Sequence, residues 1–270
     1  MPVKKEPSGR RAVEMTLEVP GTPEQVWHAL ATGPGNSAWF TTCEIEEREG
    51  GAIAFHFGPD MASRGRVTTW QPPHRFCYEE IGWSGEAPPL ATEIVIEAQA
   101  GGTCRVRMVH SLFTERDQWD DELGSMERGW PSYFEILKVY LKHFAGARSS
   151  YVRVTGDHAG PAAVAWTALR QAVGFSDARQ GTHWQTKAGR PPLAGLVERV
   201  NEQAEHGELM LRLDAPSPGV VLVGAFTWAG RTQVAISFYF YGEDASAAAA
   251  REEPTWQAWM REHFPAAAAA

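Results

Sequence analysis

Cysteine is scarce in this chain of 270 residues. Cys43, Cys77 and Cys104 lie far apart, and no two of them form a CxxC pair. Three widely spaced cysteines predict neither a disulfide framework nor a cysteine-based zinc site. This cysteine usage is typical of a reducing compartment, so we expect a cytoplasmic protein.

Long apolar runs and an excess of positive charge are also missing. No run of eighteen apolar residues occurs, so we expect no membrane-spanning helix and no membrane partner. The formal net charge is −8, and basic residues do not cluster beyond the first residues. Nucleic acid is therefore not an expected partner, because binding it requires a basic surface. The sequence leaves the oligomeric state open.

Motifs of known catalytic and cofactor sites are absent as well. The chain contains no GxSxG, HExxH, Walker loop or GxGxxG. We expect no cofactor and no metal ion. Whether the protein is an enzyme stays open at this stage.

The first half of the chain opens with a strand and a short helix. Residues 12–20 alternate between apolar and polar, which predicts a half-buried strand. Thr22 is a good N-cap, Pro23 suits the first helical position, and Gln25 completes a capping box. The segment Gly33-Pro34-Gly35 is expected to end this helix.

Strands and then a long helix follow. Residues 41–112 contain six strand-like runs separated by turn residues, which is the pattern of an antiparallel meander. Trp130, Phe134, Leu137 and Leu141 then continue one apolar stripe of a helix. Pro131 predicts that the regular part of this helix begins near Trp130, or that the helix is kinked there.

The same order of elements begins again after a linker at 145–150. A strand, a helix, several strands and a last helix follow, and the second copy is shorter by about two strands, with an irregular segment at 174–195. An internal repeat of this length predicts two domains. The expected boundaries are a disordered arm at 1–11, domains at 12–147 and 148–265, and a tail at 266–270.

A strand, a short helix, an antiparallel meander and a long helix form an α+β layout. The segments "EVPGTPEQVWHALATGPGNSAWF", "GRVTTWQPPHRFCYEE", "GGTCRVRMVHSLF" and "GWPSYFEILKVYL" resemble the Hsp90-ATPase-activator-like branch of the START (SRPBCC) superfamily. This resemblance covers about residues 12–145. The second half resembles the same fold loosely, through "AWTAL", "GAFTW" and "TQVAISFYFYG".

The resemblance implies two helix-grip domains, each with a curved antiparallel sheet that grips a long C-terminal helix, the second domain being degenerate. It also implies a cavity between sheet and helix that holds an apolar or aromatic small molecule. Proteins of this kind include polyketide cyclases, binders of natural products and self-resistance proteins against cytotoxic metabolites such as enediynes. A tandem of two such domains is similar to those from natural-product clusters.

His110 is the most informative titratable residue. It shares a strand face with Cys104, Val106 and Met108, whereas Arg107 lies on the other face. A histidine on an apolar face could orient a ligand or act as a general base, with Tyr78 as a second polar candidate. The alternative is a core histidine bonded to backbone. Arg107 would contribute only if its strand twisted it toward the mouth of the cavity.

Aromatic side chains are abundant in both halves of the chain. Either they fill two apolar cores, or they wall a ligand, and tryptophan favours the ligand because its indole N–H needs a partner. The residues that we expect to bind the ligand are Trp39, Phe55, Phe57, Tyr78, Trp83, Met108, His110, Trp130, Phe134, Trp166, Trp184, Phe226, Trp228, Phe238 and Phe240.

Three functions remain open from the sequence. The first is a binding protein for an apolar, aromatic or polyene small molecule of the polyketide kind. The second is an enzyme of the cyclase or aromatase type that uses the same cavity, with His110 and Tyr78 as candidate catalytic residues. The third is a chaperone-interaction module, as the name of the resembled branch suggests.

Overall fold

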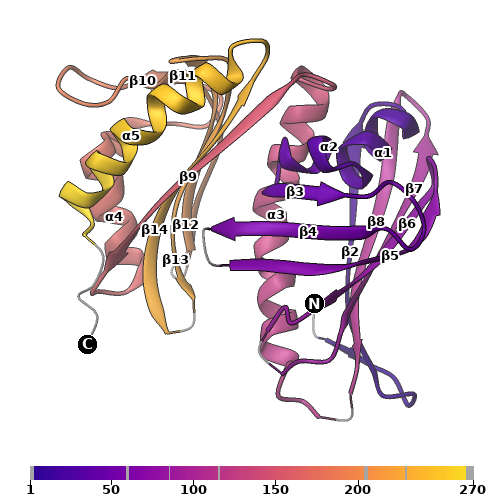
Figure 1. Cartoon of the computed structure of the whole chain (residues 1–270). Coiled ribbons are helices and arrows are strands. Elements are labelled where there is room, and N and C mark those ends of the chain that lie inside the picture. Colours follow the sequence, from indigo (N-terminus) through magenta and orange to yellow (C-terminus); the bar gives the residue numbers. More distant parts are fainter. Residues whose placement is uncertain are drawn as a thin grey trace. The chain divides into compact units, whose positions relative to one another are not determined.

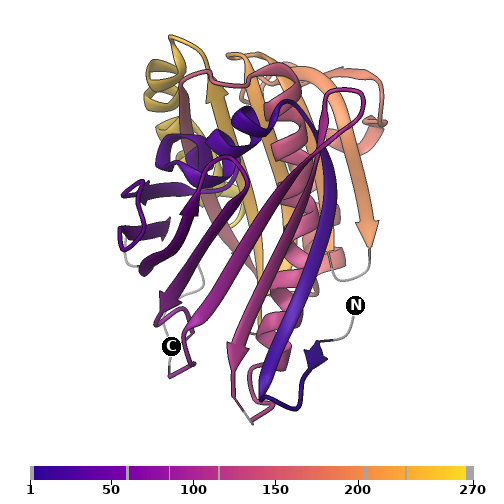
Figure 2. The same ribbon diagram turned by 90° about the vertical axis from the view of Figure 1, so that its right-hand side faces the viewer.

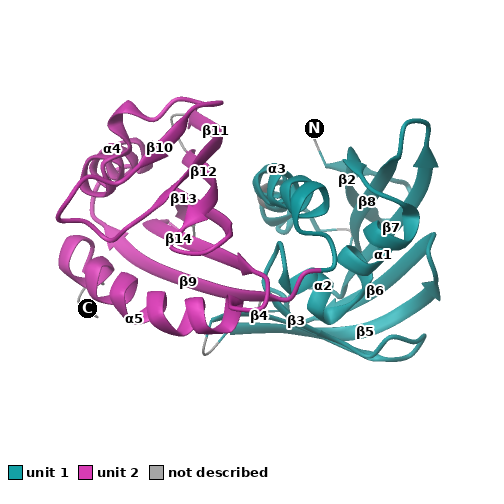
Figure 3. Cartoon of the chain, turned by 90° about the horizontal axis from the view of Figure 1, so that it is seen from above, with its two compact units in different colours: residues 1–146 teal, residues 147–270 magenta. Residues whose placement is uncertain are grey.

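The computed structural model describes residues 3–58, 61–84, 86–114, 116–203, 206–228 and 230–265, and the side chains of residues 125, 127, 203 and 228 are outside the description. The expected tail at 266–270 lies outside the described residues. The chain divides into two compact units, Met1–Gly146 and Ala147–Ala270 (Figure 3). Each unit is described by itself.

The first unit is built on an eight-stranded antiparallel sheet with the strand order β1-β2-β8-β7-β6-β5-β4-β3 (Figure 1). Strands β3 to β8 form the expected meander, and β2 pairs with β8. The strands are β1 (Lys4–Lys5), β2 (Arg10–Pro20), β3 (Thr42–Ile45), β4 (Ala52–Gly58), β5 (Met61–Gln71), β6 (Arg75–Ile81), β7 (Leu90–Gln99) and β8 (Thr103–Phe113).

The first two helices are set by local capping. Helix α1 (Pro23–Ala31) begins with the expected capping box, in which Thr22 Oγ1 accepts from the Gln25 amide and Gln25 Oε1 accepts from the Thr22 amide. The helix ends at Ala31, but Gly33 and its neighbours form a second short helix, α2 (Gly33–Ser37), instead of a loop. The reason is a second cap, because Thr32 Oγ1 accepts from the Gly35 amide at 3.1 Å.

The long helix α3 (Asp120–His143) packs against β2 (Figure 2). It begins well before Trp130, so Pro131 lies inside the helix and not at its start. An ion pair explains the early start, since Arg11 Nη1 of β2 lies 2.7 Å from Asp120 Oδ1 in the first turn. Acidic side chains also fill that turn, where they complement the helix dipole.

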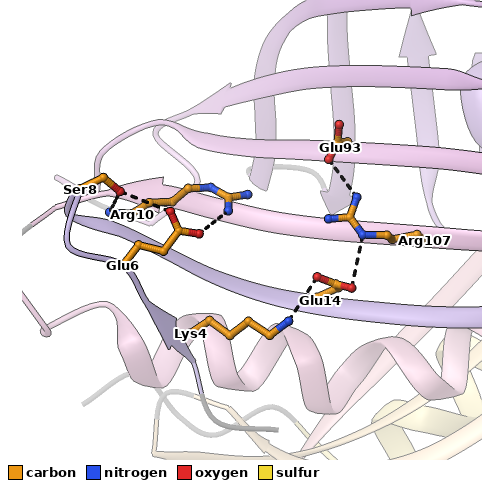
Figure 4. A network of polar contacts seen from close by, with 7 residues as sticks. All are labelled: Lys4, Glu6, Ser8, Arg10, Glu14, Glu93 and Arg107. Atoms are coloured by element: carbon orange, nitrogen blue, oxygen red, sulfur yellow. Dashed lines mark hydrogen bonds and ion pairs between the residues drawn. The ribbon is translucent and has the colours of Figure 1, made fainter.

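Two strand segments lie within the arm expected at 1–11, namely β1 and the first residues of β2. Strand β1 pairs with β2, and Lys4 contacts Glu14 at 3.3 Å (Figure 4). Arg107 joins this network through Glu14 and Glu93, at 3.3 and 3.1 Å. Arg107 therefore lies on the face of the sheet opposite to His110, and its strand does not twist it toward the interior.

The second unit contains a six-stranded antiparallel sheet, two strands smaller than the first, with the order β10-β11-β12-β13-β14-β9. Its strands are β9 (Ser149–His158), β10 (His183–Gln185), β11 (Ala194–Gln203), β12 (His206–Ala215), β13 (Gly219–Trp228) and β14 (Arg231–Tyr241). The segment expected to be irregular contains a 3₁₀ turn (Phe175–Asp177) and β10.

Two helices cover one face of the second sheet. Helix α4 (Ala162–Val173) packs on β12, β13 and β14, and α5 (Ala245–His263) packs on β9 and β14. Helix α5 starts earlier than the sequence predicted, so Pro254 lies inside it. Both units thus have the expected α+β, helix-grip-like architecture, in which helices cover one face of an antiparallel sheet.

Among the helices of the described ranges, none combines the length and the apolar character needed to cross a bilayer.

Candidate functional site

A row of polar side chains crosses the helix-covered face of the first sheet. The strand register places Tyr78 of β6 opposite Thr92 of β7, and Thr92 opposite His110 of β8. Glu80 lies two residues beyond Tyr78 and therefore points to the same face. All four side chains are buried. We call Tyr78, Glu80, Thr92 and His110 the polar row.

His110 has one bonded and one unbonded ring nitrogen. Its Nδ1 lies 2.8 Å from Thr92 Oγ1, whereas its Nε2 has no hydrogen-bond partner in the described part of the chain. The side chain is only 2% exposed. Burial lowers the pKa of His110 to about 4, so the imidazole is neutral at pH 7. A neutral imidazole can donate or accept one hydrogen bond at Nε2.

The other end of the polar row carries two acidic groups with raised pKa values. Burial raises the pKa of Glu80, although a hydrogen bond from Ser63 Oγ at 2.5 Å opposes this shift. Burial and the nearby Glu80 carboxyl together raise the pKa of Tyr78 well above its usual value, and the neighbouring Thr92 opposes this. Within the described residues no Lys or Arg pairs with Glu80.

Aromatic rings from three parts of the chain surround this row. The Trp130 ring of α3 stacks on His110, with centroids 5.5 Å apart and planes at 19°. Phe134 stacks on Trp130 at 5.3 Å, and Phe55 lies 5.6 Å from the Tyr78 ring. We call Trp39, Phe40, Phe55, Trp130 and Phe134 the ring cluster, because each contacts at least one other of these rings.

The structure brings together most of the residues that the sequence predicted for the first site. Met108 joins the polar row and the ring cluster, since it is buried on β8 two residues before His110. Phe57 lies at the edge, 5.9 Å from Phe40 and 38% exposed. Trp83 stands apart, because its Nε1 donates to the Pro88 carbonyl and its ring faces Trp119.

Four of the predicted residues of the second unit lie in one buried cluster. Trp166, Trp184, Phe238 and Phe240 belong to the hydrophobic core of this unit. The Trp166 ring lies directly on β12, where a Cβ atom on Gly207 would come within 2.2 Å of its Cγ. The Nε1 atoms of Trp166 and Trp256 are buried without a hydrogen-bond partner in the described part of the chain.

Two other predicted residues of the second unit lie elsewhere. Phe226 is on the opposite face of β13 from the cluster members Val223 and Ala225, and Arg153 Cζ lies 6.0 Å from its ring. The side chain of Trp228 lies outside the described residues. Phe226 thus cannot share a site with Phe238 and Phe240 on the helix-covered face.

Sequence reasoning missed Thr92 and Ser63. Thr92 is flanked by Leu90 and Ile94 on its face of the strand, so a threonine in an apolar alternation was the available signal. Its importance depends on the pairing of β7 with β8, which the sequence does not show. No cluster of three or more His, Cys, Asp or Glu side chains that could hold a metal ion occurs in the described ranges.

Several solved structures resemble the chain. CalU16 from Micromonospora echinospora is 19% identical, with coverage of 53% of this chain and 83% of that chain and a TM-score of 0.42. The Aha1 dimer from Colwellia psychrerythraea is 20% identical, with coverage of 50% and 98% and a TM-score of 0.41. DynU16, a putative protein in the dynemicin biosynthetic locus, is 13% identical, with coverage of 92% and 96% and a TM-score of 0.42.

No curated protein matches the sequence. A family model does match it, over residues 20–142, and its description is "Activator of Hsp90 ATPase homolog 1-like protein". The matched segment runs from the end of β2 to the end of α3 and includes the polar row and the ring cluster. Over residues 20–142 the first unit of this chain is therefore similar to that family.

Proposed function

We propose that the first unit binds an apolar small molecule with rings or a polyene chain, held between its sheet and α3. The observation that carries this proposal is the unpartnered Nε2 of His110, buried beneath the Trp130 ring. A buried polar atom without a partner costs free energy that a partner on a ligand would recover.

The ring cluster supports an apolar guest. Its side chains offer flat surfaces of the kind that line small-molecule sites, with a few polar groups to fix orientation. A guest that buries ~300 Å² of apolar surface gains about 7 kcal/mol at ~25 cal/mol per Å². After the costs of association, binding at about micromolar concentration is expected.

Polyketide-like molecules and their biosynthetic intermediates have the required chemistry, because they combine apolar or conjugated carbon skeletons with carbonyl and hydroxyl oxygens. Carriage, a biosynthetic step or self-resistance would each require such binding. The proposal assigns the site to the first unit, since the polar row gives its helix-covered face buried polar groups that could orient a ligand.

Fluorescence and thermal unfolding test this proposal. Anthracene and the polyene 1,6-diphenyl-1,3,5-hexatriene should quench tryptophan emission and raise the unfolding temperature of the protein. The variant Trp130→Leu should weaken binding at least tenfold, whereas Phe113→Leu, which alters an exposed ring of β8, should bind as the wild type does. Absence of any response to both probes would contradict the proposal.

A second candidate is an enzyme of the cyclase or aromatase type. The specific observation in its favour is that the polar row holds an imidazole and a carboxyl group buried on one face of the sheet, and such groups can act as a general base and a general acid. Under this alternative, His110→Ala should abolish turnover of a poly-β-ketone substrate and leave binding nearly intact. Equal loss of turnover and binding would argue for a binding protein.

A further inference from the structure

The hydrogen bonds of the polar row decide which kind of ligand atom His110 can recognise. Thr92 is the side-chain partner of His110, because its hydroxyl lies 2.8 Å from His110 Nδ1. No second side-chain hydrogen bond of Thr92 occurs in the described residues. The direction of this one bond therefore decides which ring nitrogen of His110 carries its proton.

Two arrangements are possible. In the first, Thr92 donates to His110 Nδ1, and the proton on His110 Nε2 is then the group without a partner among the described residues. In the second, Nδ1–H donates to Thr92. The Thr92 proton then has no side-chain acceptor among the described residues, and the bare Nε2 also lacks a partner.

The first arrangement leaves fewer buried polar groups unsatisfied, which is the arrangement that folded proteins favour. It also pairs the better acceptor, the imidazole nitrogen, with an alcohol proton.

We propose that Thr92 holds His110 in the tautomer with its proton on Nε2, so that His110 selects ligands that present a carbonyl oxygen. This inference rests on the proposed function of the first unit. His110 is the specificity-determining residue, and Thr92 is a positioning residue that acts through it. Trp130 keeps the imidazole plane fixed by stacking, and the register partner of His110 on β2 is the apolar Val13.

A matched pair of probes tests the selection. 9-Fluorenone and fluorene share one tricyclic skeleton and differ in a carbonyl group that replaces a methylene. The wild type should bind fluorenone about tenfold more tightly, because fluorene leaves the Nε2 proton unpaired. In His110→Leu this ratio should fall to about one, with the affinity for fluorene retained.

The tautomer is tested directly by long-range ¹H–¹⁵N correlation spectra of the imidazole rings, in which His110 is assigned by its loss in His110→Leu. The wild type and the control Thr16→Val, an exposed threonine of β2, should show a protonated Nε2 and a bare Nδ1. Thr92→Val should lose this preference and the tenfold ratio, while its far-UV circular dichroism stays that of the folded protein.

The outcomes separate the two proposals. Equal binding of fluorenone and fluorene, or a proton on Nδ1 in the wild type, would overturn the inference and leave the proposed function standing. Binding of neither compound would overturn the proposed function, and the inference with it.

Discussion

The helix-covered faces of the two sheets follow the same plan but carry different chemistry. In the first unit, polar side chains cross the middle of the face and aromatic rings lie over them. In the second unit, Val221, Val223, Ile236 and Phe238 lie on the helix-covered face. The buried Glu208 lies on the opposite face of β12 from the core residues Leu209 and Leu211. The same architecture thus places buried polar groups differently in the two units.

The tryptophans of the two short helices α1 and α4 pack differently in the two units. Trp27 of α1 packs edge-on against Trp70, 5.0 Å away, near one end of β5. Trp166 of α4, which occupies the equivalent place in the repeat, lies on Gly207 near the start of β12. A glycine at this position of β12 therefore lets the large indole ring approach the strand closely.

The largest expected effect compares one tryptophan from each long helix. Trp256 of α5 is fully buried against Phe238, so Trp256→Ala should lower the free energy of unfolding by about 4 kcal/mol. Trp130→Ala should cost less than half as much, because Trp130 is partly exposed. Denaturant titration followed by circular dichroism measures both. Equal losses would mean that Trp130 serves as core packing, as Trp256 does.

The second expected effect is that the stability of the first unit depends on pH. His110 has a pKa of 6.5 when unfolded and about 4 when folded, so the unfolded state binds the proton more readily. Stability should therefore fall as the pH drops from 6.5 to about 4, by about 3 kcal/mol from this residue.

The variant His110→Leu should remove this contribution, which is measured as the difference between the two unfolding curves at each pH. If the free energies of unfolding of the wild type and the variant changed with pH in parallel, His110 would not be desolvated in the folded protein. The two units would then differ less in their buried polar groups.

The third expected effect is a loss of stability at high pH, opposite to the loss at low pH that His110 causes. Because burial raises the pKa of Glu80, its native state favours the protonated form, and stability is lost as the pH rises above 4.5. Glu80→Gln keeps an acceptor for Ser63 and carries no charge. This variant should raise the unfolding temperature at pH 8 and change it little at pH 4. A lower unfolding temperature at pH 8 would indicate that a cation pairs with Glu80.

The smallest effect concerns the caps of the short helices. Thr22→Ala removes the capping box of α1 and should cost about 1 kcal/mol. The N-cap of α4 is Pro161, which makes no side-chain capping bond, so Pro161→Ala should cost clearly less. Thermal unfolding of the two variants provides the comparison, and a larger loss for Pro161→Ala would contradict it.

Features that depend on neighbours in sequence were predictable. The capping box at Thr22 and Gln25 and the meander of β3 to β8 follow from local chemistry and from turn residues. The start of α3 was not predictable in this way, because it depends on Arg11, which is more than a hundred residues away from Asp120. Strand β1 depends likewise on its pairing with β2.

The candidate site was predictable in part. Alternation along β8 placed Met108 and His110 on one face, and the helical stripe placed Trp130 and Phe134 on another. What the sequence could not show is the register that joins them, since β5 and β6 shift register between Val67 and Thr69. Thr92 acquires its role only from that pairing, and Trp166 acquires its packing role only from contact with Gly207.

Pro131 lies inside the long helix of the first unit. Proline has no amide proton, so the carbonyl of the residue four positions earlier lacks its usual intrahelical donor. The helix therefore has one backbone hydrogen bond fewer next to Trp130, whose ring stacks on His110. Under the proposed function, this weaker point would let the Trp130 ring shift for a guest with little disturbance of the helix residues that follow.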